Sequence, residues 1–390
     1  MIKQNKVPRL TGRKRNKKRK GKVLTVGKII LLAFLVMLLS LFLLALAFLN
    51  LYEPIRVNEN ENWDNYIPVK DNETDELVAP EYAPDTMERA DDIYTFLILG
   101  LHEDGLLTDT MIYVMFDTAD KKISILNIPR DTYVNTLGYK GKKINGVYRS
   151  WYETALEAGK SKDEASKEGV KAAARMIKYT FGIPVDKYVL ADTEGLRELV
   201  DAVGGVDMEV PIRMKYTDPY QNLYIDLEQG WQHLDGDKSE QLIRFRGGDY
   251  GYPSYPRADI DRIATQQKFM SALMKKMMKF DIGQIKKLFD INSKYVATNL
   301  NAKDTGWFAA KMLDVKLENI RMHTIPGEEY WANGMSCYST YKAEVMEIIN
   351  KYYNPYTEEI PSHNFNIFEP SRAYAHLADI DGVTMDSLVK

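Results

Sequence analysis

A long apolar stretch follows a strongly basic amino-terminal segment in this chain. Residues 1–28 contain twelve Lys or Arg and no acidic residue, and Ile29–Leu49 then carries no charged residue. At about 1.5 Å per residue, the 21 residues of this stretch span the roughly 30 Å hydrocarbon core of a bilayer. The stretch is too long for a signal-peptide core and lacks a clear cleavage site, so it predicts an uncleaved transmembrane anchor. The basic flank stays in the cytoplasm, which places the rest of the chain outside the cell membrane.

The basic segment has an alternative interpretation as a nucleic-acid-binding tail, because it contains the run RKRNKKRK. Its position next to the apolar stretch instead favours a topology signal that also contacts anionic lipid headgroups. Setting the twelve basic residues aside leaves 40 basic against 55 acidic side chains, a net charge of about −15. A domain of that charge is not a general polyanion binder, so we expect no nucleic-acid partner.

Composition divides the remainder into a stalk, a folded domain and a tail. Residues 53–92 contain 13 acidic residues, three basic residues and four prolines, which predicts an acidic stalk with little fixed structure. Residues 93–353 form the expected domain, and residues 354–390 a largely loose tail with one strand-like piece at 364–368. Cys337 is the only cysteine, which excludes an internal disulfide. It is better interpreted as a buried small residue than as a nucleophile.

Strand patterns alternate with helix patterns along the domain and predict an α/β fold, in which helices flank a mixed central β-sheet. We expect strands at 95–99, 110–116, 122–128, 187–190, 206–210 and 320–325, and helices at 161–181, 193–203, 281–288, 306–313 and 341–352, with a further long helix that begins at Asp259. Residues 117–120 join two of these strands as a hairpin.

The strongest candidate for a binding site is an arginine-rich stretch that leads into the long helix. Arg244 and Arg246 are two residues apart on an extended pattern, which would point both to one face. After a Gly- and Tyr-rich loop, Asp259, Arg262 and Gln266 share one side of a helix. Several guanidinium groups suit an anion with many oxygens, such as phosphate or pyrophosphate. Any one arginine could equally pair with a surface carboxylate, but the combination favours a site.

A second candidate lies between the first two predicted strands, where His102, Glu103, Asp104 and Asp109 gather. Hard cations take oxygen ligands, and a magnesium ion that bridges phosphates commonly uses one or two carboxylates. Asp109 directly precedes a buried strand and is the better ligand candidate. An acidic surface loop is at least as good an interpretation of Glu103 and Asp104. A further arginine, Arg130, follows the third strand.

These residues belong to motifs through which the chain resembles the LytR-CpsA-Psr family, over roughly residues 94–279 and more weakly to about 350. The matching motifs are FLILG at 96–100, TDTM at 108–111, IPRDT at 128–132, KINGVY at 143–148, LVDAVGGVDMEVP at 199–211, RFR at 244–246 and DIDRIATQQKF at 259–269. Any single motif is weak, but the ordered set is specific.

The resemblance implies a membrane-anchored phosphotransferase that moves a glycopolymer, of teichoic acid or capsule type, from a polyprenyl-pyrophosphate carrier to peptidoglycan. The implied fold is an α/β sandwich, with an apolar tunnel for the polyprenyl chain. The implied site contains the catalytic residues Arg130, Arg244, Arg246, Arg262 and Asp259, the substrate-binding residues Lys143, Asn145 and Gln266, and Asp109 as a ligand of Mg²⁺. Asp104 or Glu103 would substitute for the second ligand, and Asp104 is the candidate we name. The base that accepts the proton of the attacking sugar hydroxyl would be Asp259 or a loop carboxylate.

Three positions depart from the usual pattern of that family. His102 stands where an aspartate is usual, and Leu107 and Thr265 stand where arginines are usual. His102 and Leu107 lie in the loop that carries the candidate magnesium ligands, so these departures affect the predicted metal site. A second hypothesis is therefore a membrane-anchored binding protein that holds lipid-linked polymer or wall glycan without catalysing a reaction. A third hypothesis, an intracellular transcription regulator, conflicts with the apolar stretch and with the acidic domain.

Overall fold

The computed structural model describes residues 52–56, 69–70, 77–78, 87–101, 105–134, 141–221, 223–256, 259–277, 296–332, 334–368 and 382–388. All of these except Tyr52 belong to one compact unit, Glu53–Lys390. The predicted basic tail at 1–28 and the predicted transmembrane anchor at 29–49 lie outside the described residues. No helix of the described part combines the length and the apolar character needed to cross a membrane.

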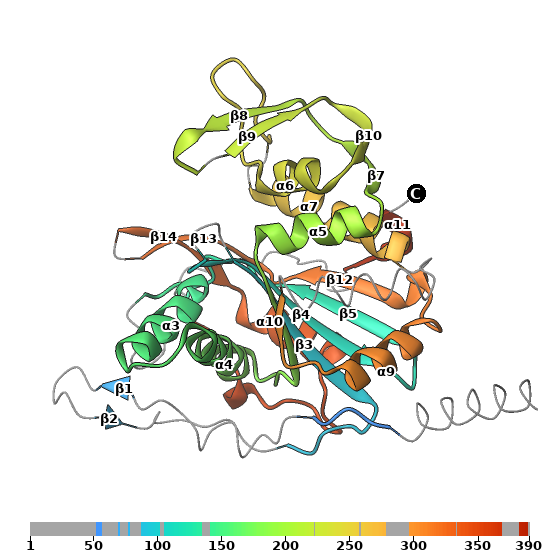
Figure 1. Cartoon of the computed structure of the whole chain (residues 1–390). Coiled ribbons are helices and arrows are strands. Elements are labelled where there is room, and N and C mark those ends of the chain that lie inside the picture. The colour runs from blue at the N-terminus through green and yellow to red at the C-terminus, as the bar shows by residue number, and fades with distance from the viewer. Residues whose placement is uncertain are drawn as a thin grey trace, which may run out of the picture. The chain divides into compact units, whose positions relative to one another are not determined.

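A seven-stranded mixed sheet lies at the centre of the unit, with the strand order β11-β6-β3-β4-β5-β12-β15 (Figure 1). Its strands are β3 (Ile93–Leu101), β4 (Thr108–Asp117), β5 (Lys122–Asn127), β6 (Lys187–Ala191), β11 (Val296–Thr298), β12 (Ile320–Thr324) and β15 (Val383–Thr384). Strand β4 is antiparallel to β3 and β5, whereas β6 is parallel to β3 and β12 is parallel to β5. Strands β3, β5, β6 and β12 therefore end at the same edge, which we name the carboxyl edge.

One face of the sheet is covered by α3 (Val147–Glu157), α4 (Lys162–Phe181) and α10 (Lys342–Tyr352) (Figure 1). Their apolar sides form one continuous core with Leu97 and Leu99 of β3, both of which are fully buried. Alternate residues of a strand point to opposite faces, so this burial follows from the period-two pattern of the sequence.

Helix α4 shows how local signals determine the bounds of an element. The Ser161 hydroxyl accepts a hydrogen bond from the Glu164 amide at 3.3 Å, and the Glu164 carboxylate accepts one from the Ser161 amide at 2.9 Å. This reciprocal pair is a capping box. Gly182 ends the helix in the left-handed region at φ 73°. The helix predicted at 161–181 is confirmed.

The opposite face carries α9 (Ala302–Met312), whose aromatic residues pack against the start of β3. The Tyr94 ring meets the rings of Trp307 and Phe308 edge-on, with centroids 5.2 and 5.1 Å apart. Phe96 adds a further edge-on contact with Phe308 at 4.9 Å. These are favoured aromatic geometries and bury a large apolar area.

A second apolar cluster is formed by the elements in the upper part of Figure 1. These elements are the helices α5 (Thr193–Ala202), α6 (Gly236–Arg244) and α7 (Asp259–Met277), the antiparallel pair β7 (Val206–Val210) and β10 (Gly230–Leu234), and the hairpin of β8 (Met214–Asp218) and β9 (Leu223–Leu227). Helix α7 joins this cluster to the sheet, because the side-chain amide of Gln267 donates to the Thr324 hydroxyl of β12 at 3.0 Å.

The hairpin of β13 (Gly327–Ala332) and β14 (Met335–Thr340) approaches the carboxyl edge. The Tyr338 amide donates to the carbonyl of Asp131 at 2.8 Å, which ties the hairpin to the loop after β5. Cys337 is only 2% exposed, and burial raises the pKa of its thiol. It is the buried small residue that the sequence predicts.

Two predictions about the ends of the domain are wrong. Tyr356, Ile360 and Phe365 are buried in the core, and β15 extends the sheet, so the described residues of the tail, 354–368 and 382–388, are not loose. No strand forms at 364–368. Irregularly spaced apolar residues carry no period, which hides such a segment from sequence analysis.

The end of the predicted acidic stalk is also ordered. The Arg89 guanidinium binds the fully buried Asp186 carboxylate, with nitrogen–oxygen distances of 3.2 and 2.8 Å. Earlier in the stalk, β1 (Val69–Lys70) pairs with β2 (Leu77–Val78). The remaining predicted strands and helices that fall in described residues are present within a few residues, and the helix predicted at 281–288 lies outside them.

Candidate functional site at the carboxyl edge

An ion pair between Asp109 and Arg130 forms the centre of the site. Asp109 is the second residue of β4, and Arg130 follows the end of β5, so both lie at the carboxyl edge. A guanidinium nitrogen, Nη1, donates to Oδ1 of Asp109 at 2.6 Å. The side chains are 21% and 28% exposed, so the pair is partly shielded but remains reachable from solvent.

The loop after β5 is held against the segment that begins α3. The Asn145 amide donates to the carbonyl of Arg130 at 3.2 Å, and the Ile144 amide donates to that of Thr132 at 2.9 Å. The Lys143 ammonium binds the Asp131 carboxylate at 2.9 Å. Arg130 and Lys143 thus both lie near Asp131, and their site roles stay predictions. Asn145 is 9% exposed and reaches this group through its backbone, and its substrate-binding role stays a prediction.

Arg244 and Arg246 do not share one face of an extended segment, and that prediction is wrong. Arg244 is the last residue of α6, and Phe245 leaves the helix in an extended conformation with φ −65° and ψ 128°. Nη1 of Arg244 binds Glu240, one helical turn earlier, at 2.8 Å. Arg246 instead approaches Asp109, with 3.9 Å between Nη2 and Oδ2. The two arginines therefore flank Phe245 and reach different carboxylates.

Helix α6 is not predicted from the sequence, because its stability comes from packing against neighbouring elements. Its sequence, GDKSEQLIR, contains Gly, Asp and Ser, which have low helix propensity. The Asp235 side chain caps its start by accepting from the Lys238 amide at 2.9 Å. Leu242 and Phe245 are buried in the second apolar cluster. Tertiary burial thus overrides weak local preference.

Gln266 and Arg262 lie one turn apart on α7, as predicted. The side-chain amide of Gln266 donates to the backbone carbonyl of Ile243 at 3.0 Å, which joins α7 to the last turn of α6. Arg262 lies near Tyr255; burial raises the pKa of that phenol, and the guanidinium acts in the opposite direction. Asp259 is the first residue of α7, but its side chain lies outside the described residues.

Two carboxylates that the sequence analysis did not single out position the cations. Asp131 lies between Lys143 and the Nε of Arg130, at 2.9 and 3.7 Å. Glu240 binds Arg244 and is only 13% exposed. The signal for Glu240 was its position four residues before Arg244, which is a favourable ion-pair spacing once a helix is assumed.

Asp109 is the one candidate magnesium ligand from the predicted loop that the structure describes. His102, Glu103 and Asp104 lie outside the described residues. Within the described ranges, no group of three His, Cys, Asp or Glu side chains could hold a metal ion. A magnesium ion that bridges phosphates commonly needs only one or two carboxylates. Asp109 lies beside Arg130 and Arg246, and its role as a metal ligand stays a prediction.

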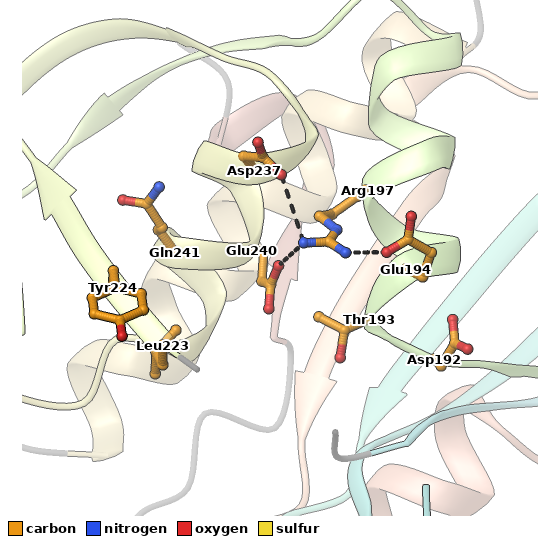
Figure 2. Close-up of a pocket in the computed structure, with 9 residues that line it drawn as sticks. All are labelled: Asp192, Thr193, Glu194, Arg197, Leu223, Tyr224, Asp237, Glu240 and Gln241. Atoms are coloured by element: carbon orange, nitrogen blue, oxygen red, sulfur yellow. Dashed lines mark hydrogen bonds and ion pairs between the residues drawn. The ribbon is translucent and has the colours of Figure 1, made fainter. Parts of the chain in front are cut away.

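A cavity of about 370 Å³ is lined mostly by polar side chains of α5, α6 and β9 (Figure 2), and one of them, Glu240, binds Arg244. None of the four predicted arginines is among the described residues that line it. It is therefore not the apolar tunnel expected for a polyprenyl chain, and the tunnel stays a prediction.

The fold and the site together define an α/β domain that presents arginines at the carboxyl edge of its sheet. Ligands of open α/β sheets bind at that edge, and clustered guanidinium groups bind oxyanions. The chain belongs to the LytR_cpsA_psr family, whose model matches residues 61–354.

Two curated relatives and one solved structure extend this assignment. The polyisoprenyl-teichoic acid–peptidoglycan teichoic acid transferase TagV of Bacillus subtilis (strain 168) is 30% identical over 199 residues, which are 50% of this chain and 45% of TagV. The transferase of the same description named TagU, from Bacillus cereus, is 27% identical over 264 residues, 66% of this chain and 77% of TagU. The crystal structure of B. subtilis TagV has a TM-score of 0.53 at 22% identity, covering 69% of this chain and 100% of that chain, and shows the same fold. The match thus spans about half the length of the curated TagV.

Proposed function

We propose that this protein is a membrane-anchored glycopolymer phosphotransferase, which moves a polymer of teichoic acid or capsule type from a polyprenyl-pyrophosphate carrier to peptidoglycan. The family membership and the transferase names of TagV and TagU support this activity. The observation that carries it in the molecule is the Asp109–Arg130 pair at the carboxyl edge, with Arg246 beside it.

The proposed reaction is a displacement at phosphorus. A hydroxyl of the acceptor glycan attacks the phosphorus attached to the polymer, a phosphodiester bond forms, and the bond to polyprenyl phosphate breaks. The proton of that hydroxyl passes to a base, for which Asp259 or another carboxylate of the site is the candidate. In such reactions the protein mainly positions groups and neutralises charge. Arg130 and Arg246 would do so by donating to the pyrophosphate oxygens, with Arg244 and Arg262 completing the set.

Mg²⁺ is the proposed cofactor, with Asp109 and Asp104 as its ligands. When bound, the ion would neutralise charge on the pyrophosphate oxygens. Arg130 and Arg246, which lie beside Asp109, would neutralise charge on the same oxygens.

A turnover assay tests the proposal. The full-length protein, a polyprenyl-pyrophosphate saccharide and a peptidoglycan acceptor should give a phosphodiester-linked product and polyprenyl phosphate, and chelation of Mg²⁺ should reduce the rate. Tight binding of the lipid-linked saccharide without turnover would instead establish the second candidate, a non-catalytic binding protein for lipid-linked polymer or wall glycan. The departures at His102 and Leu107 favour that candidate.

We also propose a single-pass topology with residues 1–28 in the cytoplasm and residues 53–390 outside the cell membrane. The charge difference across Ile29–Leu49 supports it. Protease added to intact protoplasts is expected to remove the folded unit, as followed by an antibody against it. Full protection of the unit would contradict the topology and the wall function with it.

Replacing the ligand candidates separately should distinguish their roles. We expect Asp109→Asn to raise the Mg²⁺ concentration needed for half-maximal turnover more than His102→Ala does. The reason is that a hard cation prefers a carboxylate oxygen to an imidazole nitrogen. A magnesium titration of turnover provides the measurement, and the reverse ranking would show that His102 has taken over the metal site.

A bound lipid should accompany the protein if the arginines hold a pyrophosphate. The attached chain requires an apolar environment, because each Å² of apolar surface removed from water contributes about 25 cal/mol. Methionines are adaptable enough to line such a path, and Met270, Met274 and Met277 recur on α7. We expect organic extraction of the purified protein, followed by mass spectrometry, to yield polyprenyl phosphate or pyrophosphate. An empty extract and no binding of added polyprenyl phosphate would contradict the lipid-carrier assignment.

A further inference from the structure

The polar cavity between α5, α6 and β9 has the size of a small-molecule site, since such sites begin at about 300 Å³. Its volume is about 370 Å³. Figure 2 shows that α5 and α6 contribute side chains that point toward one another, with Leu223 and Tyr224 of β9 to the left of Glu240 in the view. The lining residues are Asp192, Thr193, Glu194, Arg197, Leu223, Tyr224, Asp237, Glu240 and Gln241.

The charge of the cavity excludes the kind of ligand that suits the arginines of the carboxyl edge. Four carboxylates and a single guanidinium are among its described lining residues. That guanidinium, Arg197, already binds Glu194, and its Nη1 lies 3.1 Å from Glu240 and 3.7 Å from Asp237. A phosphate or pyrophosphate would meet a surplus of negative charge here, so the cavity favours a ligand without negative charge.

The chemistry of the lining matches a polyhydroxyl compound. Carboxylates accept strong hydrogen bonds from hydroxyl groups, and Arg197, Thr193 and Gln241 add donors. Tyr224 on β9 is 59% exposed and presents an aromatic surface at the cavity. An aromatic ring combines a broad apolar face with a polar tip, which suits the alternating CH and OH faces of a sugar ring.

The cavity is joined to the candidate site through Glu240. One oxygen of this carboxylate accepts from Arg244 at 2.8 Å, and the other accepts from Arg197 at 3.1 Å. The opposite wall begins at Asp192, directly after Ala191 of β6, which pairs with Gly100 of β3 at the carboxyl edge. A ligand in the cavity would therefore lie one carboxylate away from Arg244.

We propose that this cavity binds one neutral, hydroxyl-rich sugar unit of the acceptor glycan. The proposal deepens the proposed function and rests on it for the identity of the glycan as acceptor. The arginines would hold the charged donor at the carboxyl edge, while the cavity holds the uncharged acceptor beside it. This division brings a hydroxyl of the acceptor toward the phosphorus without competition between the two ligands for one site.

Binding of a neutral probe tests the cavity independently of catalysis. The probe is an oligomer of β-linked N-acetylglucosamine, titrated into the full-length protein in detergent by calorimetry. We expect Tyr224→Ala and Glu194→Gln each to weaken binding about tenfold, because each removes one recognition element from the cavity. Tyr250→Ala provides a matched control, because Tyr250 is fully exposed and does not line the cavity. The affinity of Tyr250→Ala for the probe should equal that of the unsubstituted protein.

A transfer assay then separates this inference from the proposed function. Tyr224→Ala should raise the KM for the acceptor about tenfold, with the KM for the lipid donor and kcat unchanged. Sugar binding that depends on Tyr224, in a protein without turnover, would overturn the transferase but leave a sugar site. Normal transfer by Tyr224→Ala, with unchanged acceptor KM and unchanged probe affinity, would overturn the sugar site alone. Binding of a divalent cation that is lost in Glu194→Gln, together with no sugar binding, would also overturn it.

Discussion

Replacing Arg246 or Arg244 by alanine is expected to slow glycopolymer transfer by about ten- to a hundredfold while the domain stays folded. A charge-assisted hydrogen bond contributes about 1.5–3 kcal/mol, and the effect on rate follows if that bond is made in the transition state. Arg246 is 54% exposed, so its removal should leave packing intact. Arg244 is 17% exposed, but its partner Glu240 retains Arg197.

The measurement is turnover of the lipid-linked saccharide, with thermal unfolding followed in parallel. Arg149→Ala is the matched control, because its guanidinium binds Glu153 on the exposed side of α3 and lies in neither site. The control should retain full turnover. If Arg244→Ala and Arg246→Ala also retain it, the two arginines are only surface features.

Arg89→Met is expected to lower the free energy of unfolding by about 3–5 kcal/mol, because it removes the guanidinium that pairs with a buried carboxylate. The Asp186 side chain is fully buried, and Arg89 is 12% exposed. Oδ2 of Asp186 also accepts from the amide and hydroxyl of Thr95, at 2.9 and 2.8 Å. Those neutral donors stay in place, but they cannot offset the lost positive charge.

Urea unfolding of the variants provides the measurement. Arg149→Met breaks a surface pair in which both side chains are 45% exposed, and should cost about 0.5 kcal/mol or less. The double variant Arg89→Met/Asp186→Asn should be more stable than Arg89→Met alone, because the buried negative charge is then absent. Equal losses in Arg89→Met and Arg149→Met would show that the buried pair contributes no more than a surface pair.

The sequence predicted those elements whose signals are local or periodic. The capping box at Ser161 and the left-handed Gly182 determine α4 without reference to the rest of the molecule. The apolar runs of β3, β4 and β5 are continuous, so their strands were predicted together with the hairpin turn. Helix α6 was missed because its nine residues are stabilised by burial of Leu242 and by contacts with α7.

The pairing of Asp109 with Arg130 could be predicted from the sequence. The predicted hairpin pairs Asp117 with Lys122 and Ile112 with Asn127, and the same register continued by three residues brings Asp109 opposite Arg130. By contrast, the approach of Arg246 to Asp109 depends on how α6 ends. The cavity beside Glu240 depends on the packing of α5 against α6, which no local pattern encodes.

The ordered segment after residue 353 affects how the protein folds during its synthesis. The Tyr356 hydroxyl lies against the Lys178 ammonium, 178 residues earlier in the chain, and its backbone pairs with that of Arg89. Phe365 completes the core that contains Phe181 of α4. A ribosome releases these segments in order, so this part of the core stays open until the later residues emerge. During synthesis the carboxyl-terminal end of α4 is thus exposed to water until these residues emerge, which makes the unfinished chain more prone to aggregation.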